Sequence, residues 1–213
     1  MPRQEPENTL PSFAAALAAG AEGIELDVHA TADGVVVVHH DPVTRDGLEI
    51  SATRWSELGA ASRDNDGAPS ISSLESVCDL VAGRVELFVE IKGRDIEPAV
   101  VAVLDGRAGT FSIHSFDHAA IGRVARLGTR YRLGLLFDEK VDDMTALLAR
   151  YGAADAWPHH GLVDRALVDA VQRSAGRVIA WTVNSPGEAR RLAAYGIDGI
   201  CTDDVTLLDF LET

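Results

Sequence analysis

Carboxylates and imidazoles interrupt an otherwise apolar segment, GIELDVHATADGVVVVHHD, at residues 23–41. Side chains alternate between the two faces of a strand, so Glu25 and Asp27 point the same way. Two carboxylates in an apolar setting repel each other and are costly to bury unless a positive charge compensates them. Their oxygens suit Mg²⁺ or Ca²⁺, and a salt-bridged pair at a strand end is the alternative.

A second strand, FVEIKG, repeats this device, because Glu90 and Lys92 also share one face. A third carboxylate would complete a metal site, and the ammonium group of Lys92 is a point charge suited to a phosphate. The alternative is a Glu–Lys pair that bridges to a neighbouring strand. The carboxyl ends of these strands are where barrel enzymes build their active sites.

His40 ends the first segment, on the strand face shared by Val36 and Val38, and its imidazole could act as an acid or base near neutral pH. His39 faces the other way and is expected at the surface or in support of the site. Asp41 precedes Pro42 and indicates a turn, although it could also orient an imidazole.

Other candidate side chains stand at later strand ends. His114 in SIHSF, and His159 and His160 in WPHHG, each have a structural or solvated role as the ordinary alternative. Trp181 in AWTVN either packs in the core or forms a wall for the organic group of a substrate. Before the first helix, Asn8 or Thr9 is expected to cap it.

Strands and helices alternate along the chain, which predicts a parallel sheet with helices outside it. So many units favour a closed TIM (β/α)8 barrel over an open sheet, and no Gly-rich dinucleotide fingerprint follows a strand. The predicted strands are 23–28, 84–93, 110–116, 131–137, 154–158, 177–184 and 197–203, and the predicted helices are 6–20, 73–83, 97–106, 117–128, 142–152, 163–176 and 185–196.

The link between 23–28 and 35–41 is too short for a parallel crossover, which takes roughly a dozen residues. Its Asp-Gly pair predicts a hairpin whose return arm ends at His40. Because the chain then opens on a helix, we expect the first barrel strand to be absent. Two unpaired sheet edges would favour low stability or a homo-oligomer.

Composition limits the class of protein. The 213 residues suit a single domain, and the net charge of −14 argues against a nucleic-acid partner or an anionic membrane surface. No apolar run reaches the roughly 20 residues of a membrane span, so no stable membrane insertion is expected. The two cysteines, Cys78 and Cys201, are expected to be buried thiols. With no signal peptide, a cytoplasmic location is expected.

Six motifs in this order resemble the glycerophosphodiester phosphodiesterase family: PENTLPSF, GIELDVHATADGVVVVHHD, VEIKG, IHSFD, AWTVN and GIDGICTD. They span nearly the whole chain, and the combination of the first three is specific. The resemblance implies a TIM barrel of the phospholipase-C-like type. It also implies hydrolysis of small-molecule glycerophosphodiesters to sn-glycerol 3-phosphate and an alcohol with Mg²⁺ or Ca²⁺, within glycerol or lipid metabolism.

The resemblance also assigns residues. It implies metal ligation by Glu25, Asp27 and Glu90, acid–base catalysis by His40, and substrate contacts by Glu7, Lys92 and Trp181. We assign His114, in the IHSFD motif, to the substrate site as well.

One motif of the family has no match. The family's first strand ends in His-Arg-Gly shortly before PENT, whereas MPRQE precedes PENT here. That His is the other acid–base group, so the activity of these 213 residues alone is open. Two alternatives stay open beside the phosphodiesterase: a non-catalytic barrel that binds a metal and a phosphorylated ligand, and a related phospholipase-type enzyme.

Overall fold

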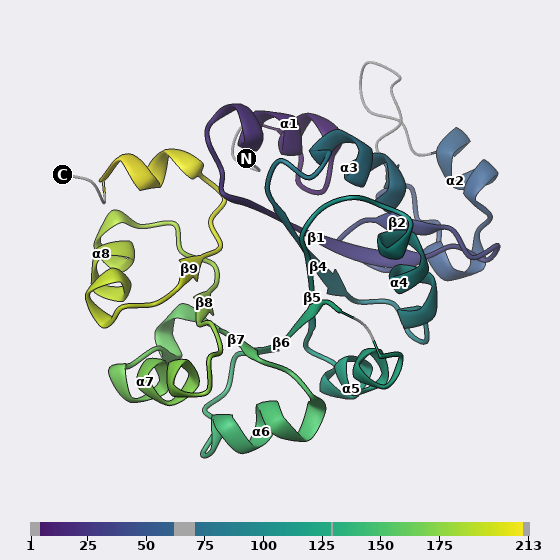
Figure 1. The fold of residues 1–213 in the computed structure, drawn as a ribbon. Coiled ribbons are helices and arrows are strands. Elements are labelled where there is room, and N and C mark those ends of the chain that lie inside the picture. Colours follow the sequence, from purple (N-terminus) through teal and green to yellow (C-terminus); the bar gives the residue numbers. More distant parts are fainter. Residues whose placement is uncertain (1–4, 62–70, 129, 211–213) are drawn as a thin grey trace. The chain divides into compact units, whose positions relative to one another are not determined.

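The computed structural model describes residues 5–61, 71–128 and 130–210, which form two compact units, 1–112 and 113–213. Figure 1 shows the alternating helices and strands of both units. Each of the seven strands predicted for the parallel sheet is present, as are the seven predicted helices. That the chain is a single domain stays a prediction.

The first unit contains a sheet in the order β3-β2-β1-β4. Strand β1 pairs with β4 in parallel and with β2 in antiparallel orientation, and β2 pairs with β3 in antiparallel orientation. Its elements are α1 (Leu10–Ala18), β1 (Gly23–Ala30), β2 (Val36–Val38), η1 (Ile50–Ala52), α2 (Trp55–Ala61), β3 (Ser72–Ser73), α3 (Leu74–Val81), β4 (Glu86–Ile91) and α4 (Glu97–Asp105). Strand β5 (Phe111–Ser115) begins in this unit and ends in the next.

The predicted hairpin is confirmed. Val28 of β1 lies opposite Val38 of β2, and Gly34 adopts a φ of 84° in the turn between the strands. Glycine adopts this left-handed conformation without steric cost, which explains the Asp-Gly signal. The return strand is shorter than the predicted 35–41, since β2 ends at Val38.

Side chains that alternate along β1 place apolar residues on one face of the sheet and carboxylates on the other. Ile24, Leu26 and Val28 are buried, and helices α1, α3 and α4 cover this side of the sheet (Figure 1). The intervening residues Glu25 and Asp27 therefore point to the opposite face. The hydrophobic face holds the strand in place, and the polar face is left for the site.

The first helix begins later than predicted. Helix α1 covers Leu10–Ala18 rather than 6–20, because Thr9 caps it by accepting a hydrogen bond from the backbone N–H of Ser12. Thr9 also donates its hydroxyl to the carbonyl of Pro6 at 2.7 Å. The cap thus falls on the second of the two predicted residues, and Asn8 has another role, described below.

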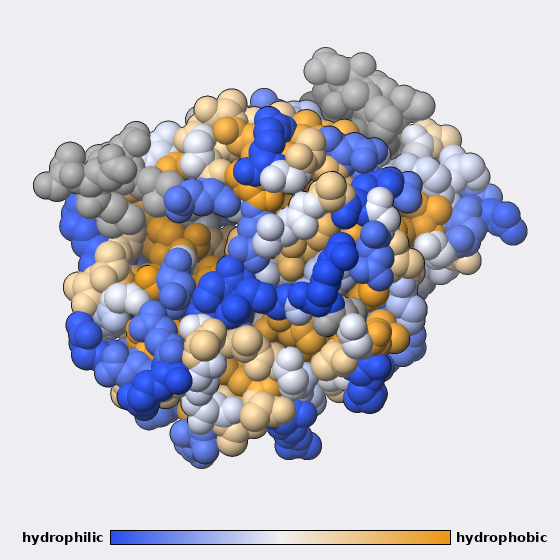
Figure 2. All heavy atoms as spheres, viewed as in Figure 1, coloured by the Kyte–Doolittle hydropathy of each residue, from blue (hydrophilic) through white to orange (hydrophobic). Residues whose placement is uncertain are grey.

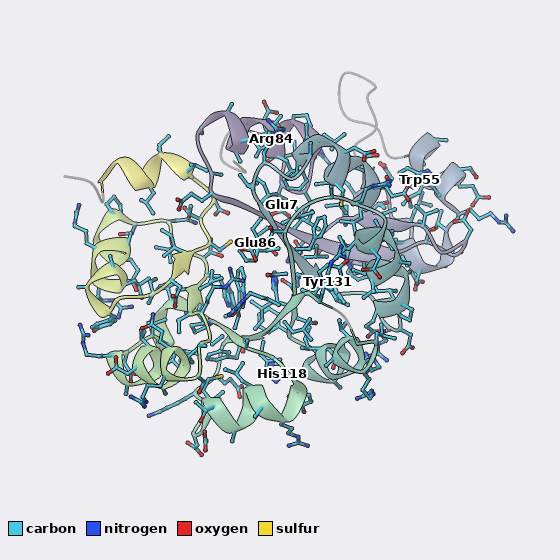
Figure 3. The ribbon with its side chains drawn as sticks, viewed as in Figure 1. Glu7, Trp55, Arg84, Glu86, His118 and Tyr131 are labelled. Carbon is cyan, nitrogen blue, oxygen red and sulfur yellow. The ribbon has the colours of Figure 1, made fainter. Side chains whose placement is uncertain are left out.

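Sequence patterns missed a small apolar cluster beyond the hairpin. Val37, Ile50, Leu58 and Ile71 are buried together, and Trp55 of α2, labelled in Figure 3, packs against them. Ile50 of η1 and Leu58 of α2 pack against Val37. They remove its side chain from water on the face of β2 opposite Val36 and Val38. Figure 2 shows apolar surface beside α2, flanked by hydrophilic residues.

The second unit repeats the strand–helix alternation. Strands β6 and β7 pair in parallel, β8 and β9 pair in parallel, and single bridges join β7 to β8. The predicted strands at 177–184 and 197–203 contract to two residues each. The elements are α5 (His118–Arg126), β6 (Arg132–Phe137), α6 (Met144–Tyr151), β7 (Asp155–Pro158), η2 (His160–Leu162), α7 (Arg165–Arg173), β8 (Ile179–Ala180), α8 (Pro186–Tyr195), β9 (Gly199–Ile200) and η3 (Val205–Phe210).

The helices of this unit are amphipathic. Helix α7 buries Val168 and Val171, whereas its outer side is hydrophilic (Figure 2). Among the helices of the described residues, none has both the length and the apolar character that a bilayer crossing requires.

A buried ion pair joins the starts of three strand segments in this unit. Asp155 is 1% exposed and accepts hydrogen bonds from Arg132 and Arg177, including one of 2.6 Å from Nη2 of Arg177. Burial acts to raise the pKa of Asp155, but the hydrogen bonds and charges of the two guanidinium groups outweigh it and lower the pKa. Asp155 therefore stabilises the unit as a carboxylate.

Replacing Asp155 with Ala leaves two guanidinium groups without their shared acceptor, so we expect the free energy of unfolding to fall by about 3 kcal/mol at neutral pH. Urea unfolding measures this loss. Because the pKa of Asp155 is lowered on folding, the difference between wild type and variant shrinks as the pH falls below about 3.9, the usual value for Asp. Asp169→Ala on the exposed side of α7 is the control and should change stability by about 0.5 kcal/mol or less. Equal losses in both variants would contradict this prediction.

Candidate functional site

The register of β1 and β4 brings the predicted metal ligands together. Asp27 is the direct cross-strand partner of Glu90, and Glu25 lies two residues earlier on the same face of β1. Neighbouring positions of a parallel pair face the same side of the sheet, so three carboxylates converge on one face. Glu90 lies near the carboxyl end of β4, as predicted, whereas Glu25 is the third residue of β1, which continues into the hairpin as far as Ala30.

Lys92 lies among these carboxylates. Its Nζ is 3.2 Å from Oε1 of Glu90 and 3.5 Å from Oδ1 of Asp27. Burial alone would lower the pKa of Lys92, but the negative charges of Asp27 and Glu90 outweigh it and raise the pKa. The lysine is therefore a permanent cation at neutral pH.

Glu25 is in an unfavourable position for a charged group. Burial raises its pKa well above the ordinary value, and the charge of Asp27 adds to the effect, while Lys92 and His40 oppose it. Glu7, labelled in Figure 3 just before α1, raises the pKa further. A carboxylate in such a field gains more from a bound cation than an exposed one would.

His40 joins the group from the loop after β2. Its Nε2 is 3.2 Å from Nζ of Lys92, and its Nδ1 is 2.9 Å from Oδ1 of Asp41. An ammonium group can only donate, so Nε2 accepts and the ring proton on Nδ1 points to Asp41. Asp41 thus orients the imidazole, which is the second of the two roles considered for it.

Strand alternation alone predicts the wrong face for His40. Val38 pairs with Val28 on the apolar side of the sheet, so an extended strand would put His40 on that side too. Instead, β2 ends at Val38 and the chain bends, so His40 faces Lys92. His29 stabilises the bend through Nε2, 3.2 Å from the carbonyl oxygen of His40.

Asn8 is the residue that sequence reasoning missed. Its side chain makes two hydrogen bonds to Asp27, one to the carboxylate at 2.8 Å and one to the backbone N–H at 3.2 Å. Spacing gives no sign of this contact, because 19 residues separate the partners. The only signal is the position of Asn8 in the PENT motif.

The second unit holds the remaining predicted residues. Trp181 meets Phe116 and His159 edge-on, with ring centroids 5.3 and 5.4 Å apart, and donates its indole N–H to the carbonyl of Trp157. Phe116 is 43% exposed, which is high for a large apolar side chain. These rings therefore form a partly exposed aromatic surface after β5, β7 and β8.

Two further histidines of this unit contact other side chains. His114 is buried on β5 and stacks on Trp157 with ring centroids 4.2 Å apart. The Nδ1 of His160 is 2.9 Å from Glu188. This contact is consistent with a structural role for His160, which was one of the alternatives considered for it.

The donor set of the first unit fits a hard divalent cation. It offers carboxylate oxygens from two adjacent strands, a lysine beside them and an imidazole whose Nε2 faces the same group. With a divalent cation bound, such an arrangement could neutralise an anion and exchange a proton with it.

Comparison with known proteins gives a consistent result. The sequence profile of the glycerophosphoryl diester phosphodiesterase family matches residues 1–207. A glycerophosphodiester phosphodiesterase from Caldanaerobacter subterraneus subsp. tengcongensis is 27% identical over 93% of this chain and 89% of its own length. One from Bacillus altitudinis is 29% identical over the same shares.

Solved structures agree with this similarity. A glycerophosphodiester phosphodiesterase from Thermotoga maritima is 26% identical and has a TM-score of 0.85 over 98% of this chain and 93% of its own. An Oleispira antarctica phosphodiesterase, solved with sn-glycerol 3-phosphate, has a TM-score of 0.90 at 23% identity, covering 99% and 93% of the two chains. The predicted TIM-barrel class of α/β fold is confirmed, although β8 and β9 form a ladder separate from the main sheet in the described residues.

Removing the charge of Lys92 should destabilise the metal-free protein. In Lys92→Met the aliphatic stem still packs, but Asp27 and Glu90 lose their cation, so we expect the free energy of unfolding in chelator to fall by about 1–3 kcal/mol. Lys140→Met, at an exposed position after β6, is the matched control and should change little. A Lys92→Met variant as stable as the control in urea would mean that another group compensates the carboxylates.

Proposed function

Because the chain belongs to the glycerophosphoryl diester phosphodiesterase family, we propose that it hydrolyses glycerophosphodiesters to sn-glycerol 3-phosphate and an alcohol with the help of a divalent cation. The chain is thus a phosphoric diester hydrolase. The observation that carries the proposal is that three carboxylates lie on one face of β1 and β4, with Lys92 and His40 beside them.

Glu25, Asp27 and Glu90 would hold the cation, which suits Mg²⁺ or Ca²⁺. When bound, the cation supplies positive charge that neutralises the phosphodiester and the charge that develops on it. The raised pKa of Glu25 supports this role, because the carboxylate is costly to ionise without such a charge.

Lys92 would contact a non-bridging oxygen of the phosphate. Its ammonium group already lies within 3.5 Å of two carboxylates and is held in its charged form by them. A positive charge beside the phosphate stabilises the negative charge that develops on it in the transition state.

His40 would serve as one of the two acid–base groups of the reaction. Asp41 holds the proton on Nδ1, so Nε2 carries the lone pair that can accept a proton from the glycerol 2-hydroxyl or from water. The other acid–base group would give a proton to the leaving alkoxide.

The remaining substrate contacts are assigned by the residues' chemistry. Trp181, supported by Phe116 and His159, offers an apolar surface for the organic part of the substrate. His114 and Glu7 are proposed as further substrate contacts.

The chain should release sn-glycerol 3-phosphate from glycerophosphocholine in Mg²⁺ or Ca²⁺, and a chelator should abolish the reaction. Asp27→Asn should lower kcat/KM by at least about 100-fold, because it removes an anionic ligand. A coupled assay for glycerol 3-phosphate measures both. Turnover that survives the chelator would refute the metal-dependent mechanism, whereas cation binding without turnover would favour the non-catalytic alternative.

Substitution of His40 should separate chemistry from metal binding. We expect His40→Gln to lower kcat roughly 100-fold to 10,000-fold, since it removes an acid–base group, while the cation dissociation constant stays near the wild-type value. Single-turnover kinetics and titration calorimetry provide the two numbers. His39→Gln is the neighbouring control and should retain activity. An equal loss of kcat in both variants would show that His40 has no specific acid–base role.

A further inference from the structure

The backbone of Asn8 adopts an uncommon conformation. Its φ is 56°, in the left-handed region that residues other than glycine seldom occupy, although Asn tolerates it better than most. Thr9 fixes the turn around it, because the Thr9 hydroxyl bonds to Pro6 and caps α1. The side chain of Asn8 is therefore directed back to β1 by a turn with little freedom.

The orientation of the Asn8 amide follows from its partners. The backbone N–H of Asp27 can only donate, so the atom 3.2 Å away is the carbonyl oxygen Oδ1 of Asn8. The amide nitrogen Nδ2 must then donate to Oδ2 of Asp27, at 2.8 Å. Both ends of the amide are used, and Asp27 is the partner in both bonds, donating one from its backbone N–H and accepting the other with its carboxylate.

These bonds constrain the carboxylate of Asp27. Oδ2 is held by the neutral amide of Asn8, whereas Oδ1 is 3.5 Å from Lys92, beyond ordinary hydrogen-bond length. Oδ1 is therefore the oxygen that can bind another cation more easily. Asp27 as a whole residue is only 6% exposed, so little water competes with Asn8 for Oδ2.

We propose that Asn8 is a positioning residue for the cation site: it fixes the plane of the Asp27 carboxylate and so presets Oδ1 for the cation. This inference rests on the proposed function and deepens it. Hydrogen bonds that orient a metal-binding carboxylate change cation affinity typically 10-fold to 100-fold when removed. A structural role alone would change the stability of the fold and leave the affinity of the folded protein unaltered.

The variant Asn8→Gly tests this distinction. Glycine adopts the left-handed turn freely, which offsets the lost hydrogen bonds, so the melting temperature in chelator should stay within about 5 °C of wild type. The dissociation constant for Mg²⁺ or Ca²⁺, measured by titration calorimetry, should rise roughly 10-fold to 100-fold.

Ala175→Gly is the matched control. Ala175 also has a left-handed φ, 58°, and is exposed at the end of α7 in the second unit. Its replacement should raise the melting temperature and leave the cation dissociation constant unchanged.

Two results would overturn the inference. A wild-type dissociation constant in Asn8→Gly would show that Asn8 does not prepare Asp27, and an unfolded Asn8→Gly variant in chelator would show a purely structural role. Cation binding by the wild-type protein tests the proposed function separately from the role of Asn8. A wild type that binds neither Mg²⁺ nor Ca²⁺ would refute the metal-dependent function and the role of Asn8 together.

Discussion

The placement of Glu25, Asp27 and Glu90 on one face of the sheet is the constraint on which the candidate site of the first unit depends. The pairing of β1 with β4 forces these carboxylates onto that face, where burial and the charge of Asp27 raise the pKa of Glu25. Lys92 compensates only part of this charge, through contacts of 3.2 and 3.5 Å. Folding thus stores an unfavourable electrostatic arrangement that a divalent cation would relieve, which is the usual compromise between stability and function.

The apolar half of the same strands stabilises this arrangement. Leu26 and Val28 are fully buried on the face opposite the carboxylates, and Leu87 and Val89 repeat the pattern on β4. The hydrophobic contacts to the helices fix the strands, and the strand register then fixes the carboxylates. The hairpin and its apolar cluster carry His40, whose orientation toward Lys92 depends on the bend after β2.

Sequence periodicity predicted the elements that follow local rules. Alternation identified the strands and the shared faces of Glu25 with Asp27 and of Glu90 with Lys92, and the Asp-Gly pair identified the hairpin. It failed where tertiary contacts decide the conformation. The bend at His40 and the contact of Asn8 with Asp27 depend on partners 11 or more residues away, which no local pattern encodes.

The most direct test of the central claim is a crystal structure of the protein grown with Mn²⁺, in which anomalous scattering locates the ion. The claim predicts a single strong peak within about 2.0–2.6 Å of oxygens from Glu25, Asp27 and Glu90, the range of hard-cation ligands. Lys92 would then have moved away from at least one carboxylate. A peak elsewhere, with Lys92 still between Asp27 and Glu90, would contradict the assignment of these carboxylates as the cation site.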